Sequence, residues 1–226
     1  MKKLATAFFM SLVMLAGLAP HARAQTLLFD YVGFDYEDPN PQPPVFGEFG
    51  SGYVSVGFVP GLFAPLVADT TNNQYTYVIN GMTPSNITPI GTFLIIDYTP
   101  GTLSVYEDSK TSGTAADYGT NPPNALAPPS FTDGNLFVTG TLTGFQIVLN
   151  LATNSGSYEG KYTVTGGTQL SNFPINQRGG WTFAGITGNA LNIPDGYYHQ
   201  VDGQTFLDKP VAAHQVTWGQ IKTRYR

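Results

Sequence analysis

Apolar and polar residues alternate along many short stretches of this chain, which is the pattern of β-strands with one buried face. In residues 145–151 four apolar side chains fall on one face, and Gln146 and Asn150 flank Val148 on the other. Similar patterns, and the segments that flank predicted turns, predict strands over residues 53–58, 75–80, 93–98, 103–107, 158–165, 181–184 and 215–218. No segment after residue 24 has a helical period, so we expect an all-β fold.

Turn residues separate these strands. Pro100 followed by Gly101 favours a type II turn at residues 99–102 and predicts a hairpin there. Residues 154–157 predict a second hairpin that makes strands 145–151 and 158–165 neighbours. Asn-Gly or Asp-Gly pairs predict further turns at residues 80, 133, 195 and 202. Turn signals at roughly every 8 to 15 residues predict an antiparallel β-sandwich, jelly-roll-like, with long loops rich in Pro and Gly.

Two proline-containing segments are predicted to be loops. Residues 37–44 contain four prolines, and residues 109–130 contain two Pro-Pro pairs. Neither segment suits the interior of a sheet, because proline has no backbone N–H to donate. Residues 109–130 have the length of either a linker between subdomains or a functional surface loop. We favour the loop, because neither half of the chain has a strand set that would bury both faces alone.

The first 24 residues have the three parts of a secretory signal peptide. Lys2 and Lys3 form a basic start, an apolar run extends from Leu4 to Leu18, and residues 22–24 form a small-x-small cleavage site. We therefore expect a secreted or periplasmic mature chain of one domain, residues 25–226. No later stretch approaches the roughly 20 apolar residues of a membrane-spanning helix, so no membrane span is expected in the mature chain.

Charge and cysteine content narrow the function. The chain has 10 basic and 15 acidic residues, and the leader contains three of the basic ones and none of the acidic, so the mature net charge is −8. Such a balance disfavours nucleic acid as a partner. The absence of cysteine excludes disulfides, thiolate metal sites and a cysteine nucleophile.

Aromatic residues are abundant, with 15 Phe, 13 Tyr and 2 Trp in the whole chain. Tyr and Trp rings can stack on sugar rings or form self-association surfaces. Tyr197, Tyr198 and Trp181 are our candidate ligand-binding residues, with Tyr31 and Tyr36 as further candidates. The alternative is that these rings form the core and cross-strand pairs of the sheet.

Acidic residues border the long loop and suggest calcium. Glu107 and Asp108 precede the loop, Asp117 lies in it and Asp133 follows it. Hard Ca²⁺ ions are held by carboxylate and carbonyl oxygens. If the loop folds back, these four side chains would gather several such oxygens. The alternative is four solvated turn residues, and no other cofactor is indicated.

Catalytic patterns are sparse, so we expect no enzymatic activity and assign no catalytic residue. The mature chain has two histidines, His199 and His214, and no G-x-S-x-G motif. A secreted glycoside hydrolase remains an alternative. It would require Glu107 or Glu159 to face another carboxyl group across a cleft.

Three segments carry a resemblance. At residues 106–108, 131–134 and 196–204 the chain resembles exported β-rich bacterial proteins that often carry a PEP-CTERM sorting tail, although it ends at residues 222–226 without that tail. The resemblance implies an envelope or matrix role in a Gram-negative bacterium. We therefore expect a structural or adhesive protein that engages extracellular polysaccharide or its own copies, with a carbohydrate-binding module as the alternative.

Overall fold

The computed structural model describes residues 23–39, 46–118 and 129–210. Residues 27–207 form one compact unit, and the described parts of a second unit, residues 23–26 and 208–210, are extended. The strands are β1 (Arg23–Asp38), β2 (Gly52–Leu62), β3 (Asn73–Met82), β4 (Pro84–Ile90), β5 (Phe93–Tyr98), β6 (Gly101–Ser109), β7 (Asn135–Asn150), β8 (Ser155–Gly166), β9 (Trp181–Gly188) and β10 (His199–Pro210). Three single-turn 3₁₀ helices are η1 (Pro129–Phe131), η2 (Leu170–Asn172) and η3 (Ile175–Gln177). The expected leader and the strand at residues 215–218 lie outside the described residues.

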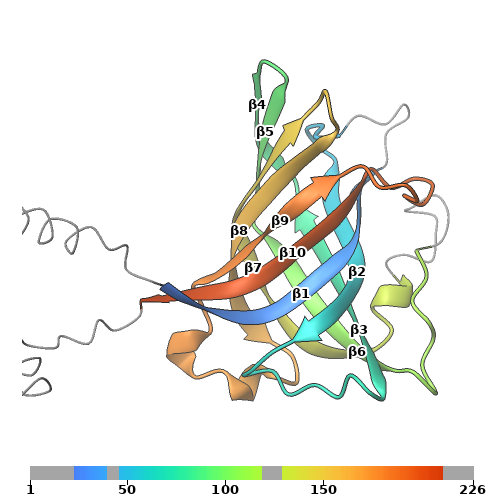
Figure 1. The fold of residues 1–226 in the computed structure, drawn as a ribbon, viewed down its shortest axis with the longest axis vertical. Helices are drawn as coiled ribbons and strands as arrows, with labels where there is room; N and C mark the ends of the chain where they lie inside the picture. The colour runs from blue at the N-terminus through green and yellow to red at the C-terminus, as the bar shows by residue number, and fades with distance from the viewer. Residues whose placement is uncertain (1–22, 40–45, 119–128, 211–226) are drawn as a thin grey trace, which may run out of the picture. The chain divides into compact units, whose positions relative to one another are not determined.

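The strands of the unit Leu27–Leu207 close into a barrel (Figure 1). They are hydrogen-bonded in the order β7-β6-β3-β2-β1-β10-β9-β8, and β8 pairs again with β7. The result is an eight-stranded, up-and-down barrel, in which strands that follow one another in sequence are neighbours. The all-β antiparallel prediction is confirmed, but the predicted β-sandwich and jelly roll are wrong.

Inward-pointing side chains fill the barrel with aromatic rings. Phe183 stacks on Tyr31 with ring centroids 4.5 Å apart, and Tyr31 meets Tyr77 edge to face at 5.3 Å. Eight strands enclose a space that side chains can just fill, so the barrel has a packed core and no channel. A sandwich and a barrel both bury every second residue, and the alternation therefore could not distinguish them.

One hairpin is longer than the barrel. β3 and β4 form one arm of this hairpin, and β5 and β6 form the other. β5 and β6 are collinear because both pair with β7, β5 with residues 146–150 and β6 with residues 135–142. Residues 99–102 are thus an interruption within one arm, and the predicted hairpin turn there is wrong. The hairpin tip lies at residues 91–92. Beyond the last pairing of β2 with β3, β4 and β5 project from the barrel end (Figure 1).

Of the other predicted turns, some are confirmed and some are wrong. The pairing of β7 with β8 and the turn at Asp195-Gly196 are confirmed. The turn between β7 and β8 lies at residues 151–154, however, and residues 155–157 of the predicted turn belong to β8. Asp133-Gly134 forms a bend. Asn80-Gly81 and Asp202-Gly203 lie inside strands β3 and β10, so the turns predicted at these two pairs are wrong. Gly203 serves packing instead, since a Cβ there would lie 2.3 Å from the Tyr31 hydroxyl.

The described part of the long loop packs on the outside of the barrel. Phe131 of η1 meets Phe58 of β2 and Tyr118, with ring centroids 5.7 and 4.9 Å apart. Thr76 of β3 donates a hydrogen bond to the Phe131 carbonyl at 2.8 Å. This loop therefore covers an apolar outer face of β2 and β3. Among the described residues, no helix has the length and apolar character needed to cross a membrane.

Candidate functional site

The aromatic residues proposed for ligand binding are mostly buried. Trp181 is 1% exposed, and its indole N–H donates to the Gln177 carbonyl at 2.9 Å. Tyr197 is 8% exposed and donates its hydroxyl to the Tyr118 carbonyl. Tyr198 is half-buried and packs beside Phe46, with ring centroids 5.6 Å apart.

The two further aromatic candidates are buried as well. Tyr31 lies in the barrel core, and Tyr36 lies under the outer loops. Trp181, Tyr197, Tyr31 and Tyr36 therefore offer no open ring face to a sugar. The alternative interpretation of these rings, as core residues, fits their positions.

Three of the four candidate calcium ligands line one hollow of about 380 Å³. Glu107, Asp108 and Asp133 lie there, whereas Asp117 does not. Glu107 Oε1 accepts hydrogen bonds from the Asn73 amide, at 3.0 Å, and from the Tyr75 hydroxyl. In the described ranges no group of three or more His, Cys, Asp or Glu side chains is arranged to hold a metal ion. Calcium binding at these residues stays an untested expectation from the sequence, and the arrangement of the described side chains does not favour it.

Glu107 and Glu159 do not form a catalytic pair. Glu107 is level with Asn135 of β7, and Glu159 is level with Gln146 of the same strand. These two levels are about 36 Å apart along β7, at roughly 3.3 Å per residue. Glycoside hydrolysis needs its two carboxyl groups within roughly 10 Å of each other.

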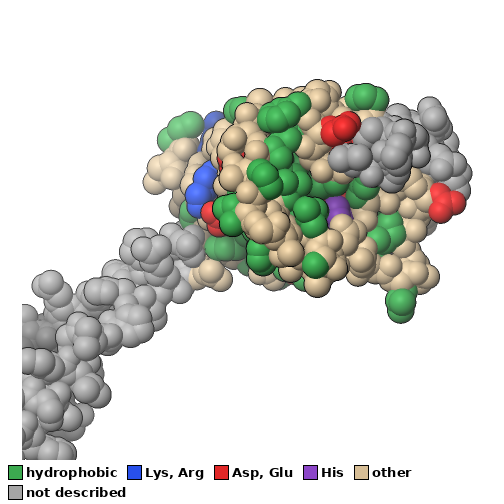
Figure 2. All heavy atoms as spheres, turned by 90° about the horizontal axis from the view of Figure 1, so that it is seen from above, with side chains coloured by type: hydrophobic (Ala, Val, Ile, Leu, Met, Phe, Trp, Pro, Cys, Tyr) green, Lys and Arg blue, Asp and Glu red, His purple; other side chains and the backbone are tan. Residues whose placement is uncertain are grey.

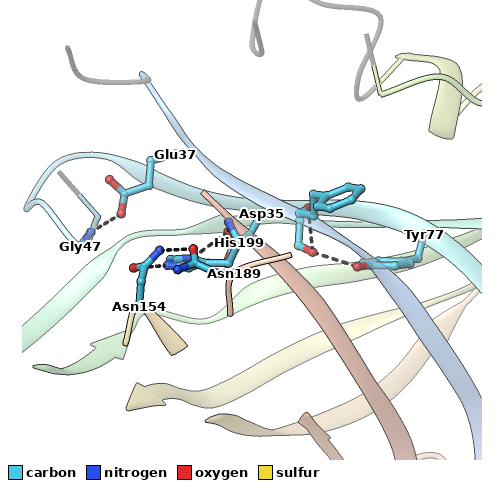
Figure 3. A network of polar contacts seen from close by, with 9 residues as sticks. Asp35, Glu37, Gly47, Tyr77, Asn154, Asn189 and His199 are labelled. Carbon is cyan, nitrogen blue, oxygen red and sulfur yellow. Dashed lines mark hydrogen bonds and ion pairs between the residues drawn. The ribbon is translucent and has the colours of Figure 1, made fainter. Parts of the chain in front are cut away.

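A chain of polar contacts crosses the seam between β1 and β10 (Figure 3). Asp35 Oδ1 accepts the backbone N–H of His199 at 2.9 Å and lies 3.1 Å from its ring Nδ1. The other ring nitrogen, Nε2, lies 3.0 Å from Asn154 Oδ1. The Asn154 amide donates to Asn189 Oδ1 at 2.9 Å, and Asn189 donates to the Thr153 carbonyl at 3.4 Å.

The last of these contacts determines which atom donates in the two hydrogen bonds of Asn189. A backbone carbonyl can only accept, so the Asn189 amide must donate to Thr153, and Asn154 must then donate to Asn189. His199 is left facing oxygen acceptors at both ring nitrogens. Its Nδ1 lies within ion-pair distance of Asp35, at 3.1 Å from Oδ1.

Glu37 is a second buried carboxyl group, two residues from Asp35 on β1. Its Oε1 accepts the backbone N–H of Gly47 at 2.6 Å, and its Oε2 is buried with no hydrogen-bond partner. Burial raises the pKa of Glu37 to about 7, against the lowering effect of the Gly47 and Glu48 N–H groups. Glu37 thus titrates near neutral pH while it holds the segment that follows residue 46.

The charged centre of this polar network is shielded from solvent, whereas Asn189 at its far end is exposed and Asn154 is partly exposed. Asp35, Glu37 and His199 are each at most 1% exposed. Figure 2 looks onto this end of the barrel, where a small part of the histidine is visible between hydrophobic side chains and other atoms. A dissolved substrate cannot touch these three groups, which instead join β1 to β10 where the barrel closes.

Thr153 and Asn189 of this network also line a groove on the outer surface, which we call the outer groove. It has a volume of about 680 Å³ and is lined by residues of β5, β7, β8, β9 and β10. Phe93 and Ile186, which are 44% and 64% exposed, supply its apolar surface. Asn150, Gln200 and Asp202 supply amide and carboxylate groups.

The outer groove follows the sheet register. Phe93 pairs with Asn150, Asn150 with Ser155, Ser155 with Gly188, and Gly188 with Gln200. Directly paired residues of neighbouring strands point to the same face. This row therefore crosses five strands over about 19 Å, at roughly 4.8 Å per strand.

No protein-family model, curated protein or solved structure matches the chain. The outer groove is thus the feature from which a function can be argued. None of its residues was among the candidates named from the sequence. Its lining comes from five strands whose order around the barrel no local pattern revealed.

Proposed function

We propose that this protein is an exported, non-enzymatic binding protein whose outer groove holds a glycan. The observation that carries the proposal is the mixed lining of the groove, where Phe93 and Ile186 lie among Asn150, Gln200 and Asp202. An apolar surface with a few polar groups that fix orientation is the usual composition of a small-molecule site.

Sugars match this lining. Their C–H faces pack on apolar and aromatic side chains, and their hydroxyl groups both donate and accept hydrogen bonds. Amide side chains also do both, so Asn150 and Gln200 suit hydroxyl partners. The Asn150 amide is already oriented, because its Oδ1 accepts the backbone N–H of Ala152 at 3.0 Å.

The groove also has the form that a chain-like ligand needs. The row from Phe93 to Gln200 is long enough for several sugar rings laid across the strands. A bound polysaccharide would attach the barrel to a matrix, which is the adhesive role expected from the sequence. We place the protein outside the cytoplasm, in the periplasm or beyond, on the strength of its leader and of its resemblance to exported bacterial proteins.

The test is binding of oligosaccharides of glucose, N-acetylglucosamine, glucosamine and uronic acid to the protein by calorimetry. Phe93→Ala should weaken binding about tenfold, because the ring that packs on the sugar is lost. Phe63→Ala is the matched control, since Phe63 is 41% exposed and does not line the groove. The absence of binding to every sugar, or equal losses in both variants, would overturn the proposal.

A further inference from the structure

Asp202 is an uncompensated negative charge in the outer groove. Its carboxylate is exposed, and within the described part of the chain it has neither a hydrogen-bond partner nor an ion-pair partner. It pairs across the strands with Ile186, so its side chain lies on the outer face beside that exposed isoleucine.

The three lysine and arginine residues whose side chains the structure describes have partners elsewhere. Lys161 donates to the Thr182 hydroxyl at 2.9 Å, Lys110 to the Thr70 carbonyl, and Arg178 to the Phe173 carbonyl. None of the three lysine and arginine side chains lines the groove. Among the side chains that the structure describes, the groove thus presents one carboxylate, the three amides of Asn150, Asn189 and Gln200, and no lysine or arginine.

A carboxylate in a groove discriminates between ligands by charge. It attracts an ammonium group, which offers three donors, and repels a carboxylate or sulfate. The acidic net charge of the mature chain adds to the repulsion of anionic polymers. A hydrogen bond between two charged groups is also stronger than one between neutral groups.

We infer that the outer groove selects glycans that carry free amino groups, such as deacetylated amino-sugar polymers, through an ion pair between the sugar ammonium and Asp202. This inference rests on the proposed function and narrows its ligand class. Phe93 and Ile186 pack on the sugar ring, Gln200 binds its hydroxyl groups, and Asp202 sets the preference for the charged amine.

The experiment compares glucosamine oligomers with N-acetylglucosamine oligomers of the same length, in which the amine is capped and neutral. At low salt we expect the glucosamine oligomer to bind the protein about tenfold more tightly. The preference should shrink in about 1 M salt, where the Debye length is roughly 3 Å. Uronic acid oligomers should bind least.

Two variants complete the design. Asp202→Asn keeps the shape of the side chain and should abolish the preference while both neutral and amino oligomers still bind. Glu159→Gln removes one negative charge from an exposed position of β8 outside the groove and should leave the preference intact. This pair separates a local ion pair from the effect of net charge.

The two proposals fail in different ways. If both oligomers bind equally to the protein and Phe93→Ala weakens both, the glycan site stands and the selection by Asp202 is overturned. A preference that survives Asp202→Asn, or that Glu159→Gln abolishes equally, overturns the selection as well. If no oligomer binds, the proposed function itself is overturned.

Discussion

Replacing Glu37 by Gln should stabilise the protein at neutral and alkaline pH. Glu37 is fully buried, and only one of its two oxygens has a hydrogen-bond partner, the Gly47 N–H. Above pH 7 the carboxyl group is ionised in a place where its charge is poorly solvated. The neutral Gln amide has the same shape and keeps an oxygen for Gly47.

The size of the effect follows from the pKa. Burial raises the pKa of Glu37 from 4.5 to about 7, which corresponds to about 3 kcal/mol of unfolding free energy at roughly 1.4 kcal/mol for each pH unit. The folded state holds the proton more tightly than the unfolded chain does. This stability is therefore fully present below pH 4.5 and is lost as the pH rises to about 7.

The assay is denaturant unfolding of both proteins between pH 4 and pH 8, followed by tryptophan fluorescence. The difference in unfolding free energy should be small at pH 4 and should favour Glu37→Gln by up to about 3 kcal/mol at pH 8. Glu159→Gln removes an exposed carboxyl group of β8 that does not act on Glu37, so it is the control and should show no such trend. A difference independent of pH, or one that favours the unmodified protein at pH 8, would refute the reasoning.

Two further predictions concern the seam and the acidic hollow. Asp35→Asn removes the charge that faces His199 and should lower the unfolding free energy by about 1 to 3 kcal/mol. A double-mutant cycle with His199→Gln should show a coupling energy of about 1 kcal/mol or more. Additive effects of the two substitutions would contradict the ion pair. Glu107 in the hollow already accepts hydrogen bonds from neighbouring side chains, so EDTA and millimolar Ca²⁺ should each leave the melting temperature unchanged. A rise of about 5 °C with Ca²⁺ would instead establish a calcium site.

The sequence predicted the local structure well, because a strand that is buried on one face has alternating apolar and polar residues. The alternation at residues 145–151 and 158–165 located β7 and β8 and made them neighbours. The closure of the barrel could not be predicted from a local pattern, since the pairing of β1 with β10 joins segments more than 150 residues apart. Pro100-Gly101 was misleading because the same pair that favours a turn also suits an interruption between collinear strands.

The sites were harder to predict, for reasons that particular residues make clear. An alternating strand shows which residues share a face but not whether that face points inward. Trp181 was therefore a candidate for ligand binding, although its side chain is buried. The buried acids left no clear signal. Asp35 and Glu37 follow Tyr31 and Gly33 at two-residue spacing, but Phe34 and Tyr36 lie on the opposite face of the same strand, so the sequence did not show which face points inward.

A barrel with a packed interior has only its outer surface and its ends to offer a ligand. Here one outer face is covered by Phe131 and its neighbours, and one end is filled by the buried network around His199. The extension of the long hairpin changes the remaining face, because it places β5 beside β7 at the level where β8, β9 and β10 begin or end. A row that would otherwise stop at β7 then continues to Phe93, and the extension thus supplies the aromatic side of the outer groove.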